Sequence, residues 1–245
     1  MALSELRDYE SENADWPPKD PPVQKASGGF EAGAIYAALL ILVFVLEQNH
    51  AFGADWIGKG ASRSDLLISE PWRAVTALTL HTGPPHLISN LLFGVLFGFL
   101  VSINLGGGIA WLAILLAGTL GNLLNGALRG TATGSIGAST AVFAAVGILV
   151  GCEWRRRVLL REQRLRRAAP FVMGALILGY FGMGGENTDV AAHVTGLFAG
   201  FLVGLALARV PLDTIHRKKT QLFCGAFAIL LLGAAWGIAL SLSGT

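Results

Sequence analysis

One serine in the stretch GSIGASTAVFAAVG has the surroundings of a nucleophile. Ser139 follows two glycines at the expected start of an apolar helix, and His193 lies in a second apolar segment, AAHVTGLFAG. A serine hydroxyl is a weak nucleophile until a base removes its proton, and histidine is the usual base. The two residues could therefore form a Ser–His dyad for acyl transfer.

Acyl transfer also needs hydrogen-bond donors for the oxyanion, and the sequence offers three kinds. Asn90 has an amide NH₂, and His86 has a ring N–H one turn earlier on the same helical face. The start of the helix that carries Ser139 adds backbone N–H groups without intrahelical partners. Simpler roles also exist, because Ser139 could pack against a neighbouring helix and Asn90 could hydrogen-bond between two helices.

The elements that must position these groups are membrane helices. Of the 245 residues, 53% are hydrophobic and 14% are charged, whereas soluble domains carry about 25% charged residues. Residues 74–128 contain no Asp, Glu, Lys or Arg, and a helix that spans a bilayer needs about 20 apolar residues. The sequence therefore predicts an all-α, polytopic membrane helical bundle. Its expected helices cover residues 33–48, 86–103, 108–127, 137–152, 169–184, 190–208 and 221–243.

The chain is expected to have three parts. Residues 1–30 are acidic and contain several prolines, which predicts a flexible cytoplasmic tail rather than a cleaved signal peptide. Residues 31–208 are expected to form a six-helix core. Residues 209–245 are expected to form a cytoplasmic connector and a seventh transmembrane helix.

The positive charges predict the orientation in the membrane. If the N-terminus is cytoplasmic, 14 of the 18 Lys and Arg residues face the cytoplasm, as the positive-inside rule requires. The seven arginines of WRRRVLLREQRLRR fit a connector facing anionic lipid better than a nucleic-acid site. We expect a multi-pass protein of a bacterial plasma membrane whose polar site opens to the outer side.

Helix geometry places the polar groups at a common depth. With a rise of 1.5 Å per residue, Ser139 lies roughly 21 Å, His193 roughly 24 Å and Asn90 roughly 21 to 24 Å from the cytoplasmic ends of their helices. His86 lies one turn higher, so all four groups share the outer third of a core about 30 Å thick. The helix counted from Gly137 is only about 24 Å long, so its recessed start should be buried in protein or line a water-filled cavity.

These segments resemble the rhomboid family of intramembrane serine proteases. The resemblance runs over about residues 33–208, through EPWRAVTALTLHTGPPHLISN, GASTAVFAAVG and AAHVTGLFAG, on the second, fourth and sixth expected helices. It implies a rhomboid-like six-helix core with one helix added at the C-terminus. It also implies that Ser139 is the nucleophile and His193 the general base. The oxyanion hole would then consist of His86, Asn90 and the backbone N–H of the serine.

The resemblance implies supporting roles for further residues. Phe143, four residues after the nucleophile, would pack under the imidazole, and Gly137 suits an irregular backbone before the helix. Trp72 and Arg73 would belong to a structured outer loop and not to the catalytic groups. Phe93 could line a lateral gate between the second and fifth helices, or it could simply face lipid.

Two threonines depart from the family pattern. Thr140 and Thr195 stand where the family has glycine after the serine and, often, two residues after the histidine. Because small residues let helices approach closely, these side chains could widen the contact between the fourth and sixth helices and lower activity. The glycines that remain on both helices favour close packing.

Asp189 precedes His193 by one helical turn and has two possible roles. It could orient the imidazole as the third member of a triad, or it could cap the sixth helix. The resemblance implies a dyad without a carboxylate, which agrees with the cap.

The resemblance implies that the protein cleaves peptide bonds in or near transmembrane segments of other proteins within the lipid bilayer. No cofactor, metal or nucleic acid is expected. One alternative is a proteolytically inactive rhomboid-like protein that binds or escorts membrane clients. Such relatives generally lack the serine or the histidine, which this chain keeps. A transporter is the other alternative, but we find no inverted repeat in the sequence to support it.

Overall fold

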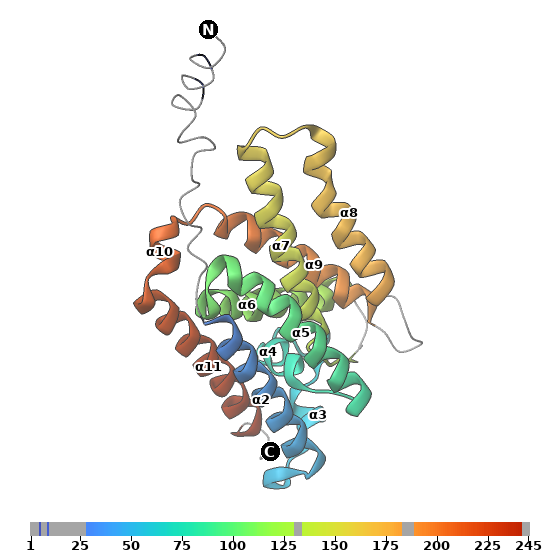
Figure 1. Cartoon of the computed structure of the whole chain (residues 1–245). Helices are drawn as coiled ribbons and strands as arrows, with labels where there is room; N and C mark the ends of the chain where they lie inside the picture. Colours follow the sequence, from blue (N-terminus) through green and yellow to red (C-terminus); the bar gives the residue numbers. More distant parts are fainter. Residues whose placement is uncertain (1–4, 6–8, 10–27, 130–133, 183–188, 242–245) are drawn as a thin grey trace.

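The computed structural model describes residues 5, 9, 28–129, 134–182 and 189–241. In this part the chain is a bundle of long helices, with short elements grouped between α2 and α5 (Figure 1). The tail expected over residues 1–30 lies almost entirely outside the described residues. The elements in chain order are α2 (Gly29–Gln48), η1 (Ala51–Gly53), α3 (Trp56–Gly60), β1 (Ser62–Arg63), α4 (Arg73–Thr76), η2 (Ala77–Thr79), α5 (Pro84–Leu105), α6 (Gly107–Arg129), β2 (Gly134–Ser135), α7 (Ser139–Leu159), α8 (Arg164–Phe181), α9 (Val190–Leu207), α10 (Leu212–His216) and α11 (Lys218–Ser241).

Each of the seven membrane helices expected from the sequence corresponds to a long helix. Over the described ranges, five helices are long and apolar enough to cross a membrane, namely α2, α5, α6, α9 and α11. α7 and α8 differ because they carry charges, since α7 ends in EWRRRVL and α8 begins with RLRR. The predicted all-α, polytopic bundle is confirmed.

The predicted boundaries of two helices were wrong. α7 begins at Ser139 and not at Gly137, because Gly137 has a φ of 129°, far from helical backbone. α7 also continues to Leu159, and α8 already begins at Arg164. Both helices therefore extend into the segment expected to be a connector. Arginine and leucine are good helix formers, so the helices continue beyond the apolar residues.

α7 and α9 lie in backbone contact. A Cβ atom added at Gly147 of α7 would collide with the carbonyl of Leu197, and one added at Gly200 of α9 would collide with the carbonyl of Ala144. The same holds for Gly151, Gly196 and Gly204. Helices approach this closely only where side chains are absent. The close packing predicted for these two helices is confirmed.

The two threonines fit into this contact. Thr140 is 1% exposed, and its methyl group lies against Gly121 of α6 and Gly196 of α9. The hydroxyl of Thr195 donates to the carbonyl of Ala192 in its own helix (3.0 Å). Neither side chain separates α7 from α9, because one occupies space left by glycines and the other bonds along its own helix.

Residues 51–82 correspond to the outer loop expected from the sequence; we call them the outer segment, and they support the start of α7. β1 pairs antiparallel with β2, which places Ser62 opposite Ser135 and Arg63 opposite Gly134. The short ladder therefore ties the outer segment to the residues just before Ser139.

Arg73 holds the outer segment together from inside. The residue is 6% exposed, and its guanidinium donates to the carboxylate of Glu70 (2.6 Å) and to the carbonyls of Gly58 (2.8 Å) and Ala61 (3.1 Å). A buried charge is tolerated when it is paired and hydrogen-bonded in this way. The structural role predicted for Arg73 is confirmed.

The last helix supports the same segment. Trp236 of α11 packs against Trp56, with ring centroids 4.6 Å apart, and its indole N–H donates to the hydroxyl of Thr79 (3.0 Å). The C-terminal half of α11 is therefore joined to the residues that precede α5.

α2 and α11 both start beside the turn between α5 and α6. Gln221 of α11 donates to the carbonyl of Leu105 (2.8 Å) and accepts from the N–H of Ile109 (3.1 Å). On the other side of the turn, a Cβ atom at Gly107 would collide with the carbonyl of Gly28, next to the start of α2. This turn therefore fixes one end of both helices.

Replacing Gly200 by leucine should separate α7 from α9. The new side chain would meet the backbone of Ala144, which cannot move aside, so we expect a loss of stability of about 3 kcal/mol. Thermal unfolding in detergent micelles measures the loss. Gly237→Leu on α11 is the matched control, because no heavy atom lies within 4 Å of a Cβ placed there. Equal unfolding temperatures for the two variants would contradict this description of the contact.

Candidate active site

Ser139 is the first residue of α7, and the backbone before it is irregular. Gly137 has a φ of 129°, and its N–H donates to the carbonyl of Ala77 in the outer segment (2.9 Å). Glycine adopts such a φ at little cost. Ala138 and Thr140 are each 1% exposed, whereas Ser139 is half-buried. The serine is therefore the accessible residue of a buried segment.

The ring of His193 on α9 has a defined tautomer. The residue is buried, and its Nδ1 lies 2.9 Å from the carbonyl oxygen of Gly182 at the end of α8. A carbonyl only accepts hydrogen bonds, so Nδ1 must carry a proton. The neutral ring then has its lone pair on Nε2, which is the state that a general base needs.

Phe143 fixes the place of this ring. The ring centroids of Phe143 and His193 are 4.5 Å apart, with planes inclined by 32°. Phe143 follows Ser139 by four residues, so the two side chains lie on one face of α7. The imidazole of His193 therefore packs on the face of α7 that carries the serine.

His86 approaches the serine through the space left by Gly137. A Cβ atom added at Gly137 would lie 2.7 Å from Nε2 of His86 and 3.6 Å from Oγ of Ser139. The opposite ring nitrogen, Nδ1, accepts a long hydrogen bond from the backbone N–H of Thr82 (3.5 Å) and lies 3.2 Å from the hydroxyl of Thr82, which can donate to it. Because Nδ1 accepts, the neutral ring carries its proton on Nε2, where it can donate.

Asn90 lies one turn further along α5 and is 4% exposed. Its amide NH₂ donates to the carbonyl of His86 (3.0 Å), and its backbone carbonyl accepts from the hydroxyl of Tyr36 (2.9 Å). An amide NH₂ has two protons, so one of them is still available as a donor. In this structure the ring of His86 lies beside Ser139, whereas the amide of Asn90 makes no hydrogen bond with Ser139.

The hydrogen bond of the expected dyad is not formed in this structure. Among the described residues, the hydroxyl of Ser139 has no hydrogen-bond partner. Catalytic hydrogen bonds are often long in the free enzyme and shorten when substrate binds. The arrangement thus offers an unengaged hydroxyl, an imidazole with a lone pair and an imidazole with an N–H donor.

A backbone donor is also present at the serine. The N–H of Ser139 belongs to the first turn of α7, where N–H groups have no intrahelical acceptor. A negatively charged oxygen formed beside the serine could accept from it. No group of three His, Cys, Asp or Glu within the described ranges could hold a metal ion.

The carboxylate of Asp189 caps α9. It accepts from the N–H of Ala192 (3.0 Å), from the amide of Asn125 (3.0 Å) and from the guanidinium of Arg129 (2.6 Å). The capping role predicted for Asp189 is confirmed. The bonds to Asn125 and Arg129, both on α6, were not predicted, and they hold the start of α9 against the end of α6.

His81 is a residue that the sequence analysis missed. It is 1% exposed, and its ring meets the ring of His86 edge-on with centroids 5.1 Å apart. Burial, together with the charge of His86, lowers the pKa of His81 to about 4. A neutral His81 therefore supports the ring of His86. The available signal was the first histidine of HTGPPH, five residues before His86.

Comparisons with known proteins agree on one family. Residues 69–210 match the family model described as the rhomboid domain. Rhomboid protease GluP of Bacillus subtilis is 29% identical over 208 residues, which cover 83% of this chain and 39% of that protein. Rhomboid-like protein 11, chloroplastic, of Arabidopsis thaliana is 31% identical over 192 residues, 74% of this chain and 67% of that protein. Rhomboid protease GlpG of Enterobacter sp. is 28% identical over 209 residues, 80% of this chain and 67% of that protein.

Acidification should destabilise the protein through His81. The unfolded chain takes up a proton at this residue near pH 6.5 and the folded chain only near pH 4, so the folded state binds fewer protons in between. The contribution of His81 to the free energy of unfolding is therefore complete above pH 6.5. It falls by about 3 kcal/mol as the pH drops toward 4. Thermal unfolding over this pH range measures the effect. His81→Phe should show a weaker pH dependence, and an unchanged dependence would exclude His81 as its source.

Removal of the Asp189 carboxylate should loosen the start of α9. Asp189→Ala leaves the N–H of Ala192 uncapped and the guanidinium of Arg129 without this carboxylate, which should cost about 1–3 kcal/mol. Asp189→Asn keeps a capping oxygen and should lose less. The exposed Asp213→Ala on α10 is the control for removing one carboxylate. Thermal unfolding at neutral pH compares the three variants, and equal stability of all three would count against the network.

Proposed function

This chain belongs to the rhomboid family, and on that premise we propose that it is an intramembrane serine endopeptidase. The family and its protease-named members support an intramembrane protease function. Ser139 is the nucleophile and His193 the general base. The observation that carries this assignment is the orientation of the His193 ring, which Gly182 and Phe143 hold with an unprotonated Nε2 on the serine-bearing face of α7.

The reaction begins with proton transfer inside the dyad. Nε2 of His193 takes the proton of the Ser139 hydroxyl while Oγ forms a bond to the carbonyl carbon of the substrate. The tetrahedral intermediate then breaks its C–N bond, and the protonated imidazole gives its proton to the leaving amine. Water, deprotonated by His193, hydrolyses the acyl-serine ester and restores the hydroxyl.

The oxyanion would be held by donors on two helices. The Nε2–H of His86 lies at the space that Gly137 leaves open, next to Oγ of Ser139, and the N–H of Ser139 would donate from the first turn of α7. In this proposal Asn90 contributes the second proton of its amide from the same face of α5. Preorganised donors of this kind are worth about 3–4 kcal/mol each in the transition state.

A transmembrane substrate would reach the site between α5 and α8. Phe93 of α5 and Phe181 of α8 are in contact there, with ring centroids 4.6 Å apart. The path opens when these two rings separate, whereas α7 and α9 stay in backbone contact. The substrate helix must unwind locally, since its carbonyls are otherwise hydrogen-bonded, and residues of low helix propensity near the cut favour this.

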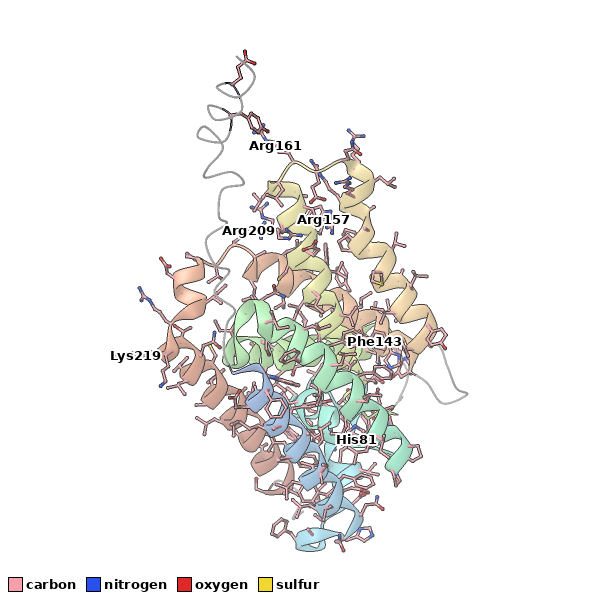
Figure 2. All side chains as sticks on the ribbon, in the orientation of Figure 1. His81, Phe143, Arg157, Arg161, Arg209 and Lys219 are labelled. Atoms are coloured by element: carbon pink, nitrogen blue, oxygen red, sulfur yellow. The ribbon has the colours of Figure 1, made fainter. Side chains whose placement is uncertain are left out.

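The distribution of charge supports the proposed orientation. Arg157, Arg161 and Arg209 lie at one end of the molecule, and His81 lies toward the other (Figure 2). We assign the arginine-rich end to the cytoplasm, following the positive-inside rule. The site then opens to the opposite side of a plasma membrane.

A rhomboid-like protein that binds clients without cleaving them is the second candidate. The lack of a hydrogen bond between Ser139 and His193 in the free protein favours it, whereas the retention of both residues favours the protease. Cleavage of a model transmembrane substrate separates the two, because the second candidate would bind that substrate and leave it intact.

Ser139→Ala should abolish both covalent labelling and cleavage. Purified wild-type protein should react with a fluorophosphonate probe and cleave a model transmembrane substrate in detergent or in liposomes. Loss of either dyad residue should reduce the cleavage rate by about 10³-fold or more, since the two act as a unit. His193→Gln should therefore match the serine variant.

The exposed Ser69→Ala in the outer segment is the matched control and should label like the wild type. Thermal unfolding shows whether each variant is folded. Equal labelling of wild type and Ser139→Ala would remove Ser139 from the mechanism, and binding without cleavage by the wild type would favour the client-binding protein.

A further inference from the structure

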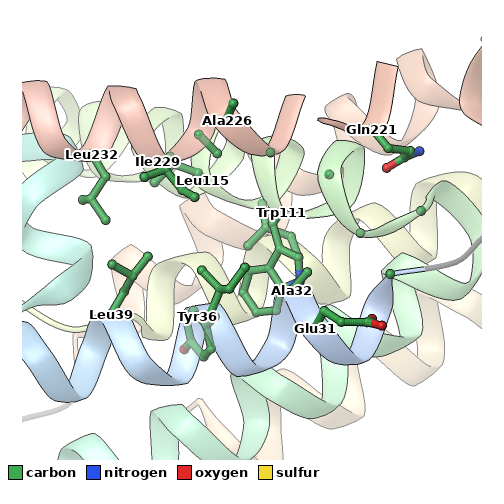
Figure 3. Close-up of a pocket in the computed structure, with 18 of the residues that line it drawn as sticks. Glu31, Ala32, Tyr36, Leu39, Trp111, Leu115, Gln221, Ala226, Ile229 and Leu232 are labelled. Carbon is green, nitrogen blue, oxygen red and sulfur yellow. The ribbon is translucent and has the colours of Figure 1, made fainter. Parts of the chain in front are cut away.

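A cavity of about 930 Å³ lies between α2 and α11, with α6 as its back wall (Figure 3). None of the four polar groups proposed for catalysis, Ser139, His193, His86 and Asn90, lines it. The cavity is therefore a feature separate from the proposed active site, and its size and apolar lining are those of a ligand site.

Contacts at both ends hold α2 and α11 in place around the cavity. At one end, Gly107 contacts the carbonyl of Gly28, and Gln221 is hydrogen-bonded to the turn between α5 and α6. At the other end, Trp236 of α11 is fixed by Trp56 and Thr79, and Val43 of α2 belongs to the same hydrophobic cluster. The space between the two helices is therefore preformed by the fold.

Most of the lining is apolar. Side chains from three helices point into the space in Figure 3, among them Leu39, Leu115, Ile229 and Leu232. Tyr36 and Trp111 stack at the back with ring centroids 4.5 Å apart, and the hydroxyl of Tyr36 is already bonded to the carbonyl of Asn90. The body of a ligand in this space should be hydrocarbon.

One end of the cavity is charged. Glu31 and Lys218 line this end beside Gln221, and Arg217 and Lys219 are exposed next to the lysine. Both α2 and α11 start here, and helix N-termini favour negative charge. A phosphate next to an ammonium group would match the lysine and the glutamate.

The length of the cavity matches one leaflet of a bilayer. From Gln221 to Leu232, α11 rises about 16 Å, close to half of a hydrocarbon core about 30 Å thick. A single acyl chain extended over one leaflet has this length.

We infer that the cavity binds a zwitterionic glycerophospholipid from the leaflet on the arginine-rich side. The phosphate of the lipid lies at Lys218, its ammonium group lies near Glu31, and an acyl chain fills the space between α2 and α11. Ala138 and Ala141, which lie one residue before and two residues after Ser139, also line the cavity. A bound lipid therefore packs behind the first turn of α7.

Native mass spectrometry of the full chain with added phosphatidylethanolamine tests the inference. The wild type should retain one lipid molecule. Ala226→Phe, which fills the cavity from α11, and Lys218→Glu, which reverses the charge at its mouth, should each weaken binding by about tenfold or more, equal to about 1.4 kcal/mol. A diacylglycerol with the same acyl chains should bind more weakly by a similar factor.

Two matched controls separate the site from general attraction to lipid. Ala234→Phe adds the same side chain to an exposed position of α11, and Lys219→Glu reverses a neighbouring charge that does not line the cavity. Both should bind like the wild type, with thermal unfolding as the check on folding. The inference is overturned if no lipid is retained, if the controls lose as much binding as the test variants, if diacylglycerol binds equally well, or if a peptide or a second copy is found in place of lipid.

Discussion

The contact between the backbones of α7 and α9 is the constraint on which the candidate site depends. Helices in a bilayer gain little from excluding lipid, so their association relies on close van der Waals contact. Glycines on both helices meet the carbonyls of the facing helix, which leaves no room for either helix to shift. Ser139 and His193 take their relative positions from this contact. A larger residue at the contact would therefore disturb the site without changing any polar group.

Two backbone groups determine how the two imidazoles of the site can act. The carbonyl of Gly182 requires a proton on Nδ1 of His193, and the N–H of Thr82 requires a lone pair on Nδ1 of His86. As a result, Nε2 of His193 is a hydrogen-bond acceptor, whereas Nε2 of His86 is a donor. Residues at the edges of helices α5 and α8 thus assign different tasks to two identical side chains.

The sequence predicted the helices better than the contacts between them. Long apolar segments depend on neighbours along the chain, so they could be deduced from one sequence, whereas the packing of Phe143 against His193 was expected only from the family resemblance. The charged ends of α7 and α8 were missed because hydropathy identifies apolar segments and does not detect helical residues that are charged. The ion pair of Asp189 and Arg129 joins residues 60 positions apart, so periodicity could not predict it. The cavity could not be predicted either, because it depends on which helices meet. His81 was overlooked because its importance comes from burial.

The appended helix α11 gives the fold a mechanical property. Its Trp236 holds Thr79, two residues from the carbonyl of Ala77 that anchors Gly137, and Ser139 follows two residues later. A short series of contacts thus runs from the C-terminal helix to the start of α7. Any tilt of α11 would therefore be transmitted to the backbone that carries Ser139, so this helix acts as a brace for that segment.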